Sequence, residues 1–334
     1  MSRRSALLFM VLSILVCLLF FLDLIVGAVS LSLKDVWATF MGREVSSSTR
    51  LIVFEIRLMK AIVAVMAGVA LSVSGLQMQT LFRNPLAGPY VLGISSGASL
   101  GVALFILGMP ILGIAGNSTF SSLGTAGAAW IGSALILAFI ASVSIRIKDI
   151  MVILILGMMF SSGVSAIVQI LQYLSNEEAL KSFVIWTMGS LGDVTSGQLK
   201  LLIPAVLVGL VMSVAVIKPL NQLLLGEQYA STMGLNVRKA RYLIFLSTTL
   251  LAGTVTAFCG PIGFVGLAIP HISRMLFSTA DHRLLLLGTA LCGAAVLLLC
   301  DIVSKWLTLP INTITALLGI PVVVWVVVRN KSIV

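Results

Sequence analysis

The sequence predicts an all-α polytopic membrane protein with about ten transmembrane helices, and three properties point to this fold class: length, composition and hydropathy. Of the 334 residues, 59% are hydrophobic and 10% are charged, and the mean hydropathy is +1.16. Soluble domains carry about 25% charged residues, so the composition excludes a water-soluble globular enzyme. Because one helical span takes about 20 apolar residues, we expect a single transmembrane domain over residues 1–334 with short connections.

Apolar runs, interrupted by Gly, Pro and charged residues, place the spans along the chain. The first run follows Arg3 and Arg4, as in a signal peptide, but it is too long for one and no clear cleavage site follows. We therefore expect it to remain as a helix. The predicted spans are residues 6–28, 59–80, 91–109, 123–145, 150–173, 200–218, 240–259, 261–277, 284–304 and 311–328. An even number of spans puts both termini on the same side of the membrane.

Basic residues in the short connections predict the orientation, because cytoplasmic loops carry an excess of Lys and Arg. With a cytoplasmic N-terminus, 13 of the 21 basic residues lie on the inner side. They are Arg3, Arg4, Arg83, Arg146, Lys148, Lys218, Arg238, Lys239, Arg241, Arg274, Arg283, Arg329 and Lys331. This bias predicts cytoplasmic termini in a bacterial inner membrane, and it explains the net charge of +10 without a nucleic-acid partner. Most other basic residues fall in the first outer loop, where an acidic partner or a solvated loop would account for them.

Residues for catalysis or metal binding are scarce. His271 and His282 have no partner at the spacing of a metal pair or a catalytic dyad, so we expect no catalytic residue, no metal site and no enzyme activity. No Gly-Lys dipeptide occurs, so the phosphate-binding loop of an ATPase is missing. The acidic residues of the spans lie near the span ends, which disfavours coupling to an ion. These residues are Asp23, Asp149, Asp281 and Asp301.

The fifth predicted span carries a stripe of small and polar residues. One such residue recurs every four positions, so the stripe occupies one face of a helix. Its members are Gly157, Ser161, Ser165 and Gln169. Such a face lines a weakly polar pathway or packs closely against another helix, and the pattern leaves both interpretations open.

Two connections on the predicted inner side have unusual sequences. Asn84 and two prolines interrupt the chain between the second and third spans and predict a tight, non-helical turn. Residues 220–235 are amphipathic and are punctuated by Gly226 and Gly234, which predicts two short helices. Such an element fits a groove in a partner protein, although an ordinary interfacial connection has the same pattern.

Three segments give the chain a family resemblance. Residues 260–271 read Gly-Pro-Ile-Gly-Phe-Val-Gly-Leu-Ala-Ile-Pro-His, and residues 281–283 read Asp-His-Arg. Together with Asn-Pro-Leu-Ala-Gly-Pro at residues 84–89, they resemble the FecCD-type permeases of ABC importers for ferric siderophores, haem and vitamin B12. The resemblance extends from about residue 50 to the C-terminus. It implies a fold like that of the vitamin B12 importer permease, the transmembrane subunit of a type II importer.

The resemblance also implies an activity and a set of partners. The chain would be the permease of an ATP-driven importer that carries an iron chelate, either a ferric siderophore or haem, into the cytoplasm. Vitamin B12 is the alternative cargo, and an autonomous ion-coupled carrier is a remote alternative. The implied partners are two ABC ATPase subunits, a periplasmic or lipid-anchored substrate-binding protein and a second permease, most simply in a homodimer. ATP and Mg would be used by the ATPase, and this chain would bind no cofactor.

On the outer face, the resemblance assigns the docking of the binding protein to basic residues. Arg57, Lys60 and Lys305 fall where family members present basic side chains to acidic residues on the two lobes of the binding protein. This chain has Met59 where the family usually has Pro, and Lys at positions 60 and 305 where Arg is common. A lysine lacks the bidentate fork of arginine, so the docking contact at these two positions would differ in geometry from that of most family members.

On the inner side, the resemblance assigns residues to ATPase coupling and to the pathway. The coupling loop spans about residues 220–235, and Asn84 with Leu86 would narrow the inner end of the pathway. The coupling residues are Leu225, Gly226, Glu227 and Gly234. If the stripe of the fifth span forms a pathway, as its spacing allows, Gly157, Ser161 and Ser165 would line it. His271 is expected to be structural, because a lone imidazole is a poor metal site.

Overall fold

The structure, a computed structural model, describes residues 3–27, 29, 31–43, 45–109, 121–147 and 149–329. Within these ranges the chain forms helices joined by turns and contains no β-strand. Lys148 and Lys331, two of the basic residues expected on the inner side, lie outside the described residues.

Seven helices are long and apolar enough to cross a membrane. They are α1 (Arg3–Ile25), the continuous helix of α3 (Ser47–Leu51), η1 (Ile52–Leu58) and α4 (Met59–Leu81), then α7 (Ser121–Arg146), α8 (Ile150–Leu174), α10 (Ser196–Ala215), the continuous helix of α13 (Val237–Thr248), η4 (Thr249–Gly253) and α14 (Thr254–Cys259), and α16 (His282–Leu307). Three shorter apolar helices are α5 (Ile94–Ala103) with η2 (Leu104–Gly108), α15 (Val265–Phe277) and α17 (Ile311–Arg329). All ten coincide with predicted spans, which confirms the fold class.

Two predicted spans have different boundaries in the structure. The helix of the second span begins at Ser47, so residues 47–58 are helical where we expected an outer loop. Ser46 caps this helix by accepting from Thr49 N, and no proline interrupts it before Leu81. The predicted eighth span, 261–277, is helical only from Val265. Residues 260–263 have no regular secondary structure, and Phe264, directly before the helix, has a positive φ of 65°.

Two helices were not predicted, because both are short and partly polar. In α2 (Leu33–Phe40) a reciprocal capping box joins Ser32 and Asp35. In α9 (Glu177–Met188) the side chain of Asn176 caps the first turn by accepting from Ala179 N at 2.9 Å. Caps of this kind satisfy the free N–H groups of a helix start, so local side chains stabilise both helices.

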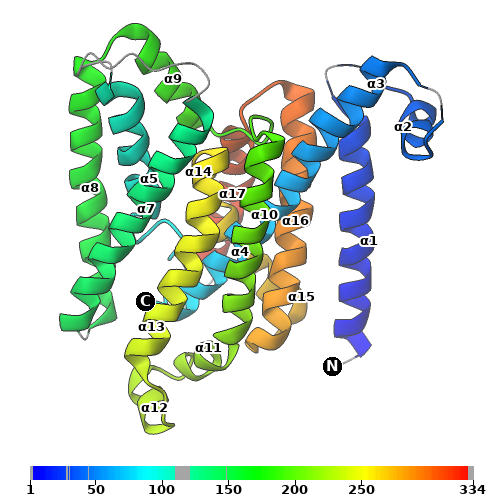
Figure 1. The fold of residues 1–334 in the computed structure, drawn as a ribbon. Helices are drawn as coiled ribbons and strands as arrows, with labels where there is room; N and C mark the ends of the chain where they lie inside the picture. Colours follow the sequence, from blue (N-terminus) through cyan, green and yellow to red (C-terminus); the bar gives the residue numbers. More distant parts are fainter. Residues whose placement is uncertain are drawn as a thin grey trace.

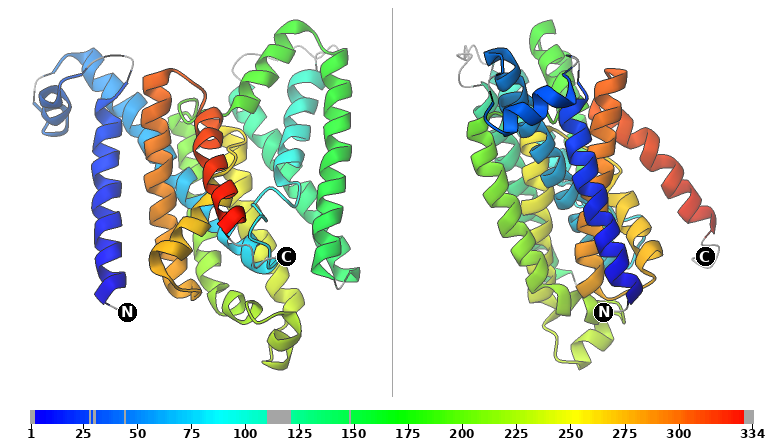
Figure 2. Two further views of the ribbon diagram at one scale, coloured as in Figure 1. Left: turned by 180° about the vertical axis from the view of Figure 1, so that it is seen from behind. Right: turned by 90° about the vertical axis from the view of Figure 1, so that its right-hand side faces the viewer.

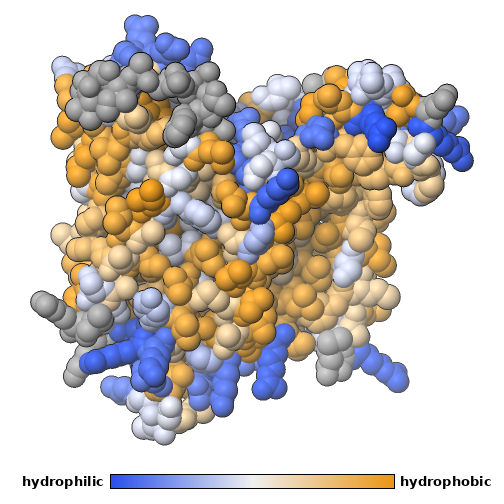
Figure 3. Space-filling view, viewed as in Figure 1, coloured by the Kyte–Doolittle hydropathy of each residue, from blue (hydrophilic) through white to orange (hydrophobic). Residues whose placement is uncertain are grey.

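The long helices run between the two ends of the bundle. We call the end where α1 begins the N-terminal side and the other end the opposite side. Figure 1 shows α4 running through the middle, with α1 and α16 on one flank and α5, α7 and α8 on the other. The short helices α11 (Ile217–Leu223) and α12 (Glu227–Thr232) extend beyond the other helices on the N-terminal side. In Figure 2, α17 leans away from the rest of the bundle. Figure 3 shows an apolar band, with hydrophilic residues gathered at its two ends.

Glycine lets α4 approach its neighbours at backbone distance. A Cβ atom added to Gly68 would lie 2.3 Å from the carbonyl oxygen of Gly293 in α16. A Cβ atom on Gly75 would lie 1.7 Å from the carbonyl oxygen of Gly266 in α15. Small residues at crossings are typical of membrane bundles, where association depends on close van der Waals packing.

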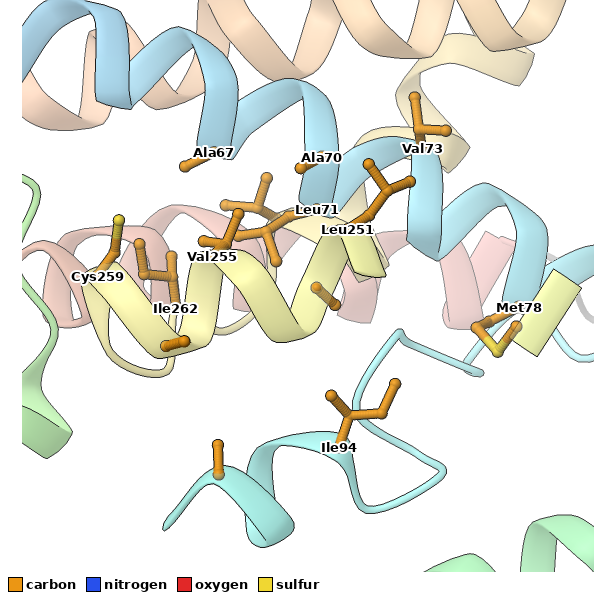
Figure 4. Packing of buried hydrophobic residues seen from close by; sticks show 14 of the residues in the cluster. Ala67, Ala70, Leu71, Val73, Met78, Ile94, Leu251, Val255, Cys259 and Ile262 are labelled. Atoms are coloured by element: carbon orange, nitrogen blue, oxygen red, sulfur yellow. The ribbon is translucent and has the colours of Figure 1, made fainter. Parts of the chain in front are cut away.

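The core around α4 is apolar but holds one polar network. Figure 4 shows Leu71 of α4 next to Val255 of α14, while Ile94 of α5 lies on the other side of α14; all three are buried. Nearer the N-terminal side, Gln77 Nε2 donates to Ser213 Oγ of α10 at 2.7 Å, and Gln77 Oε1 accepts from Thr248 of α13 at 2.9 Å. Because a polar side chain inside a bilayer needs a protein partner, this network ties three spans together.

Candidate functional site

On the opposite side, the three predicted docking residues line one cavity. Arg57 of η1, Lys60 of α4 and Lys305 of α16 border a space of about 470 Å³. The structure thus brings together residues that lie far apart in the sequence. Their role in docking stays a prediction.

The two lysines of this cavity are paired with buried carboxylates. Lys305 Nζ lies 2.8 Å from Asp23 Oδ1 and 2.9 Å from Asp301 Oδ2. Lys60 Nζ lies 3.0 Å from Asp301 Oδ1. Both carboxylates are fully buried, whereas 21% of the Lys60 side chain is exposed. The positive charges of two lysines thus neutralise the negative charges of two carboxylates. This direct contact offsets the free-energy cost of burying the carboxylates.

Arg57 is 4% exposed, and its guanidinium binds backbone carbonyl groups of the same subunit. Its Nη1 donates to the carbonyl oxygens of Leu24 at 2.8 Å and Ile25 at 2.6 Å, and its Nη2 donates to the carbonyl of Val29. Carbonyls at the end of a helix lack intrahelical partners and carry partial negative charge. Arg57 therefore caps α1, and its role in docking stays a prediction.

On the N-terminal side, residues 82–93 form the predicted non-helical turn between α4 and α5. Asn84 Oδ1 accepts from Leu86 N at 2.9 Å, and Asn84 O accepts from Ala87 N at 3.1 Å. The Leu86 side chain, 44% exposed, is left on the surface of the turn. Asn84 therefore shapes the turn, while Leu86 is free to contact another group.

A histidine from α15 holds the same turn. His271 Nε2 lies 2.7 Å from Pro85 O, and because a carbonyl only accepts, Nε2 carries the proton. Gln79 lies alongside, donating to Leu267 O at 2.9 Å and accepting from Arg274 Nη1 at 2.5 Å. These contacts join α4, the turn and α15, and they fit the structural role expected of this histidine.

The segment predicted to couple to an ATPase consists of α11 and α12, which confirms the two short helices. Gly226 and Gly234 flank α12 with φ of 100° and 83°, a left-handed backbone that disfavours residues with a Cβ atom. Leu225 and Tyr229 are 59% and 68% exposed. The tip of the bundle therefore presents apolar side chains, beyond the other helices (Figure 1).

Glu227 at the start of α12 is bound by an arginine from α13. Arg241 Nε donates to Glu227 Oε1 at 2.8 Å, and Arg241 Nη2 also donates to the other carboxylate oxygen. The Arg241 side chain is 5% exposed and the Glu227 side chain is 27% exposed. A bidentate pair of this kind fixes both position and direction, so α12 is held to the membrane-spanning helix that follows it.

A second network ties α11 to α16 and α4. Asn221 Nδ2 donates to Asp281 Oδ1 at 2.7 Å, and Asn221 Oδ1 accepts from the backbone N–H of His282 at 2.9 Å. His282 Nδ1, 2.7 Å from Asn221 Oδ1, therefore donates, and its Nε2 lies 2.8 Å from Thr80 Oγ1. The Asp-His-Arg motif thus joins the coupling segment to the end of α4.

Asp281 also caps α16. Its Oδ1 accepts from Arg283 N at 3.0 Å. This backbone hydrogen bond, followed by the bond from the Asn221 amide, lowers the pKa of Asp281 from its ordinary value of 3.8. The carboxylate is therefore the form that this cap stabilises.

The stripe on α8 changes its environment along the helix. Gly157 is buried and lies against the backbone of Val91 and Leu92. Ser161 is half-buried and Ser165 is exposed, and each hydroxyl donates to the carbonyl four residues earlier, at 2.9 Å. Close packing against Val91 and Leu92 therefore explains why residue 157 is a glycine, whereas the Ser165 side chain lies exposed on the surface of α8.

Sequence reasoning missed the partners of these residues. Arg241, Asn221 and Thr80 carried no signal beyond charge or polarity in the sequence. The one available sign was the motif at residues 281–283, which marked His282 without naming its partners. Long-range contacts of this kind depend on how the helices pack.

The comparisons with known proteins agree with this architecture. The sequence profile of the FecCD transport family matches residues 14–329. The chain belongs to the FecCD transport family. Its fold is also that of a solved structure, described as an inward-facing metal-chelate type ABC transporter, with a TM-score of 0.84 and 32% identity over 96% of this chain and 98% of the other. PsaBC from Streptococcus pneumoniae, at 19% identity and a TM-score of 0.58, shares the fold alone.

Several relatives of this FecCD family chain are permeases with different named cargoes. The hemin transport permease HmuU of Yersinia pestis is 37% identical, covering 92% of this chain and 90% of the relative. The molybdate import permease MolB of Haemophilus influenzae is 36% identical, with coverages of 89% and 88%. The vitamin B12 import permease BtuC of Serratia proteamaculans is 36% identical, with coverages of 91% and 89%. The family is thus confirmed, and the cargoes named for these relatives include molybdate, an oxyanion, beside hemin and vitamin B12.

Proposed function

We propose that this chain is the permease subunit of an ATP-driven ABC importer that carries an iron chelate, either a ferric siderophore or haem, across a bacterial inner membrane. The observation that carries the proposal is the pair α11 and α12, which extends beyond the bundle with exposed Leu225 and Tyr229. Membership of the FecCD transport family supports it. In this proposal the N-terminal side is cytoplasmic, both termini face the cytoplasm, and the domain is one unit over residues 1–334.

The mechanism requires a motor on another chain. Two ABC ATPase subunits bind ATP and Mg and close against each other, and α11 and α12 receive that movement. The pair Glu227–Arg241 passes it to α13, and Asn221 with His282 passes it to α16 and α4. The turn of Asn84 and Leu86 follows directly after α4, and in this proposal it narrows or opens the inner end of the pathway. Gly157, Ser161 and Ser165 would line that pathway.

On the outer side, a substrate-binding protein docks at the cavity of Lys60 and Lys305. Acidic side chains of that protein would compete with Asp23 and Asp301 for the two ammonium groups. Lys60 is the more exposed of the two lysines, so it offers the first contact. Arg57 supports the cavity wall by capping α1, and two copies of the permease would present two such cavities to the two lobes.

Uptake by reconstituted vesicles tests this function. Proteoliposomes would hold the permease, its ATPase and its binding protein, and uptake of a ferric siderophore, haem, cobalamin and molybdate would be compared with and without ATP in the motor compartment. Accumulation of an iron chelate that depends on ATP is expected. ATP-dependent accumulation of cobalamin or molybdate would support the importer mechanism but show that the proposed cargo is wrong. Uptake by the permease alone would favour an autonomous carrier.

A further inference from the structure

A cavity of about 300 Å³ opens between α7 and α13 on the N-terminal side. Its wall combines small side chains with groups that can bind an anion. Ala138 and Ser142 come from α7, and Arg238 and Tyr242 come from α13. Neither the coupling segment nor the cavity of the opposite side includes these residues.

Arg238 is the charged group of this cavity, and it is exposed. Among the residues that the structure describes, no acidic side chain forms an ion pair with Arg238, whereas Arg241, three residues later, is paired with Glu227. Tyr242, 54% exposed, adds a phenol beside it. Arginine and tyrosine at the end of membrane helices are typical anchors at the boundary between hydrocarbon and head groups.

An exposed apolar stripe runs along α7 away from this cavity. Ile131, Leu135, Ala138 and Ser142 follow one another at three- or four-residue spacing, which puts them on one helical face. Ile131 and Leu135 are 64% and 65% exposed. From Ser142 to Ile131 the helix rises about 16 Å, roughly half of the 30 Å hydrocarbon core. The stripe therefore has the length of one leaflet.

A larger apolar groove borders the far end of the stripe. Its volume is about 480 Å³, and Ile131, Leu135 and Phe139 form one wall while Phe160 of α8 and Leu104 of η2 contribute to the others. Phe139 and Phe160 stack with ring centroids 4.7 Å apart. Such a lining accepts an extended hydrocarbon chain, because the side chains of the groove offer few polar atoms that a polar ligand could bind.

We propose that Arg238 and Tyr242 bind the phosphate head group of an anionic phospholipid of the cytoplasmic leaflet, whose acyl chains lie along the Ile131–Leu135 stripe. The charge of Arg238, the leaflet-length stripe and the adjoining groove each fit one part of such a lipid. The inference needs the proposed orientation, with the N-terminal side in the cytoplasm, but it is independent of the cargo and of ATP coupling. It can therefore fail while the transport function stands.

Native mass spectrometry of the full-length, delipidated permease in detergent tests the site. Dioleoyl-phosphatidylglycerol, dioleoyl-phosphatidylcholine and inorganic phosphate would each be titrated. We expect tight phosphatidylglycerol adducts, at least fivefold weaker binding of phosphatidylcholine, and at least tenfold weaker phosphatidylglycerol binding in Arg238→Gln. Arg238→Lys, which keeps the charge, should retain most of the binding, and Arg283→Gln, an exposed basic residue at the start of α16, should retain all of it.

Ala138→Trp, which fills the cavity, should also abolish the phosphatidylglycerol adduct. A thermal unfolding transition of Ala138→Trp and of Arg238→Gln shows whether each variant folds. If Ala138→Trp does not fold, Arg238→Gln alone decides. Equal phosphatidylglycerol binding in wild type and Arg238→Gln would overturn the proposal. Phosphate that competes fully with the lipid would point to a free anion site instead. A different result would be that Ala138→Trp dissociates a permease dimer and leaves the lipid adducts unchanged. That result would show that a second copy of the chain covers this face, and it would also overturn the proposal.

Discussion

The Arg241 guanidinium binds the Glu227 carboxylate through two of its nitrogen atoms. This pair joins the first residue of α12 to the first turns of α13, although 14 positions separate the two residues. Glu227 is therefore a fixed part of the coupling segment and not a free acidic group on its surface. The direction of α12, and with it the position of the exposed Tyr229, depends on this contact.

Replacing Glu227 by Lys should uncouple ATP hydrolysis from uptake. The substitution places two cations together, one of them the buried Arg241 guanidinium, so α12 is expected to swing away from α13. The ratio of cargo imported to ATP hydrolysed, measured in proteoliposomes, should fall at least tenfold while hydrolysis continues.

Two control variants refine this test. Glu227→Gln keeps the shape and one hydrogen bond, so its ratio should fall less. Arg238→Gln removes a nearby charge without touching the pair and should keep the wild-type ratio. Unchanged transport by Glu227→Lys would remove Glu227 from the coupling pathway.

Replacing Asp301 by Ala should destabilise the permease strongly. The change removes the carboxylate that pairs with Lys60 and leaves Lys305 with Asp23 alone. Removing one member of a buried ion pair costs about 3–5 kcal/mol. Thermal unfolding in detergent measures the loss, and Glu178→Ala on the exposed start of α9 serves as the control, with an expected change within about 0.5 kcal/mol. A loss no larger than that of the control would mean that the ion network adds no net stability.

Asn221 and His282 should show energetic coupling in a double-mutant cycle. Asn221→Ala, His282→Ala and the double variant would be compared by the free energy of unfolding. Because His282 Nδ1 donates to Asn221 Oδ1 at 2.7 Å, we expect an interaction of about 0.5–3 kcal/mol. The bond from the backbone N–H of His282 remains in His282→Ala, so the cycle reports the imidazole bond alone. The pair Asn221→Ala and Glu178→Ala, on opposite ends of the bundle, should be additive. Additivity in both pairs would show that the observed hydrogen bonds carry no mutual stabilisation.

Gly75→Ala should prevent α4 and α15 from packing. The new Cβ atom would meet the carbonyl oxygen of Gly266 at 1.7 Å, and a backbone atom cannot move aside as a side chain can. The yield of monodisperse permease in size-exclusion chromatography should drop sharply. Gly163→Ala in α8, where nothing lies within 4 Å, should be neutral or slightly stabilising, because alanine is the better helix former. Normal yield from Gly75→Ala would contradict the close crossing.

Asp281 should stabilise the fold in a pH-dependent way. Its pKa is lowered from 3.8 by the Arg283 backbone N–H and then by Asn221, so its contribution is fully present above the unfolded-state pKa and is lost as the pH falls through the folded-state pKa. Asp281→Asn keeps an acceptor oxygen but no charge. The difference in unfolding free energy between wild type and variant should be constant from pH 7 to 5 and should shrink below about pH 4. A difference that grows on acidification would contradict this sign.

Local features of the sequence predicted most of the fold. The spans were found because a bilayer demands long apolar helices, and the turn after α4 was found because Asn84 and its two prolines cannot continue a helix. Gly226 and Gly234 marked the ends of α12 for a similar reason, since few other residues adopt a positive φ. The early start at Ser47 and the helices α2 and α9 were missed, because caps and amphipathic patterns over a few residues are weak signals.

Hydropathy and motifs within short segments of the sequence were enough to establish the membrane class, the approximate positions of the apolar helices and the family. Only the tertiary structure decided which charges meet. It showed that Arg57 caps α1, that Lys60 and Lys305 share Asp301, and that Arg241 holds Glu227. The physical reason is that ion pairs and hydrogen bonds act over a few ångströms, and only helix packing brings distant residues within that range.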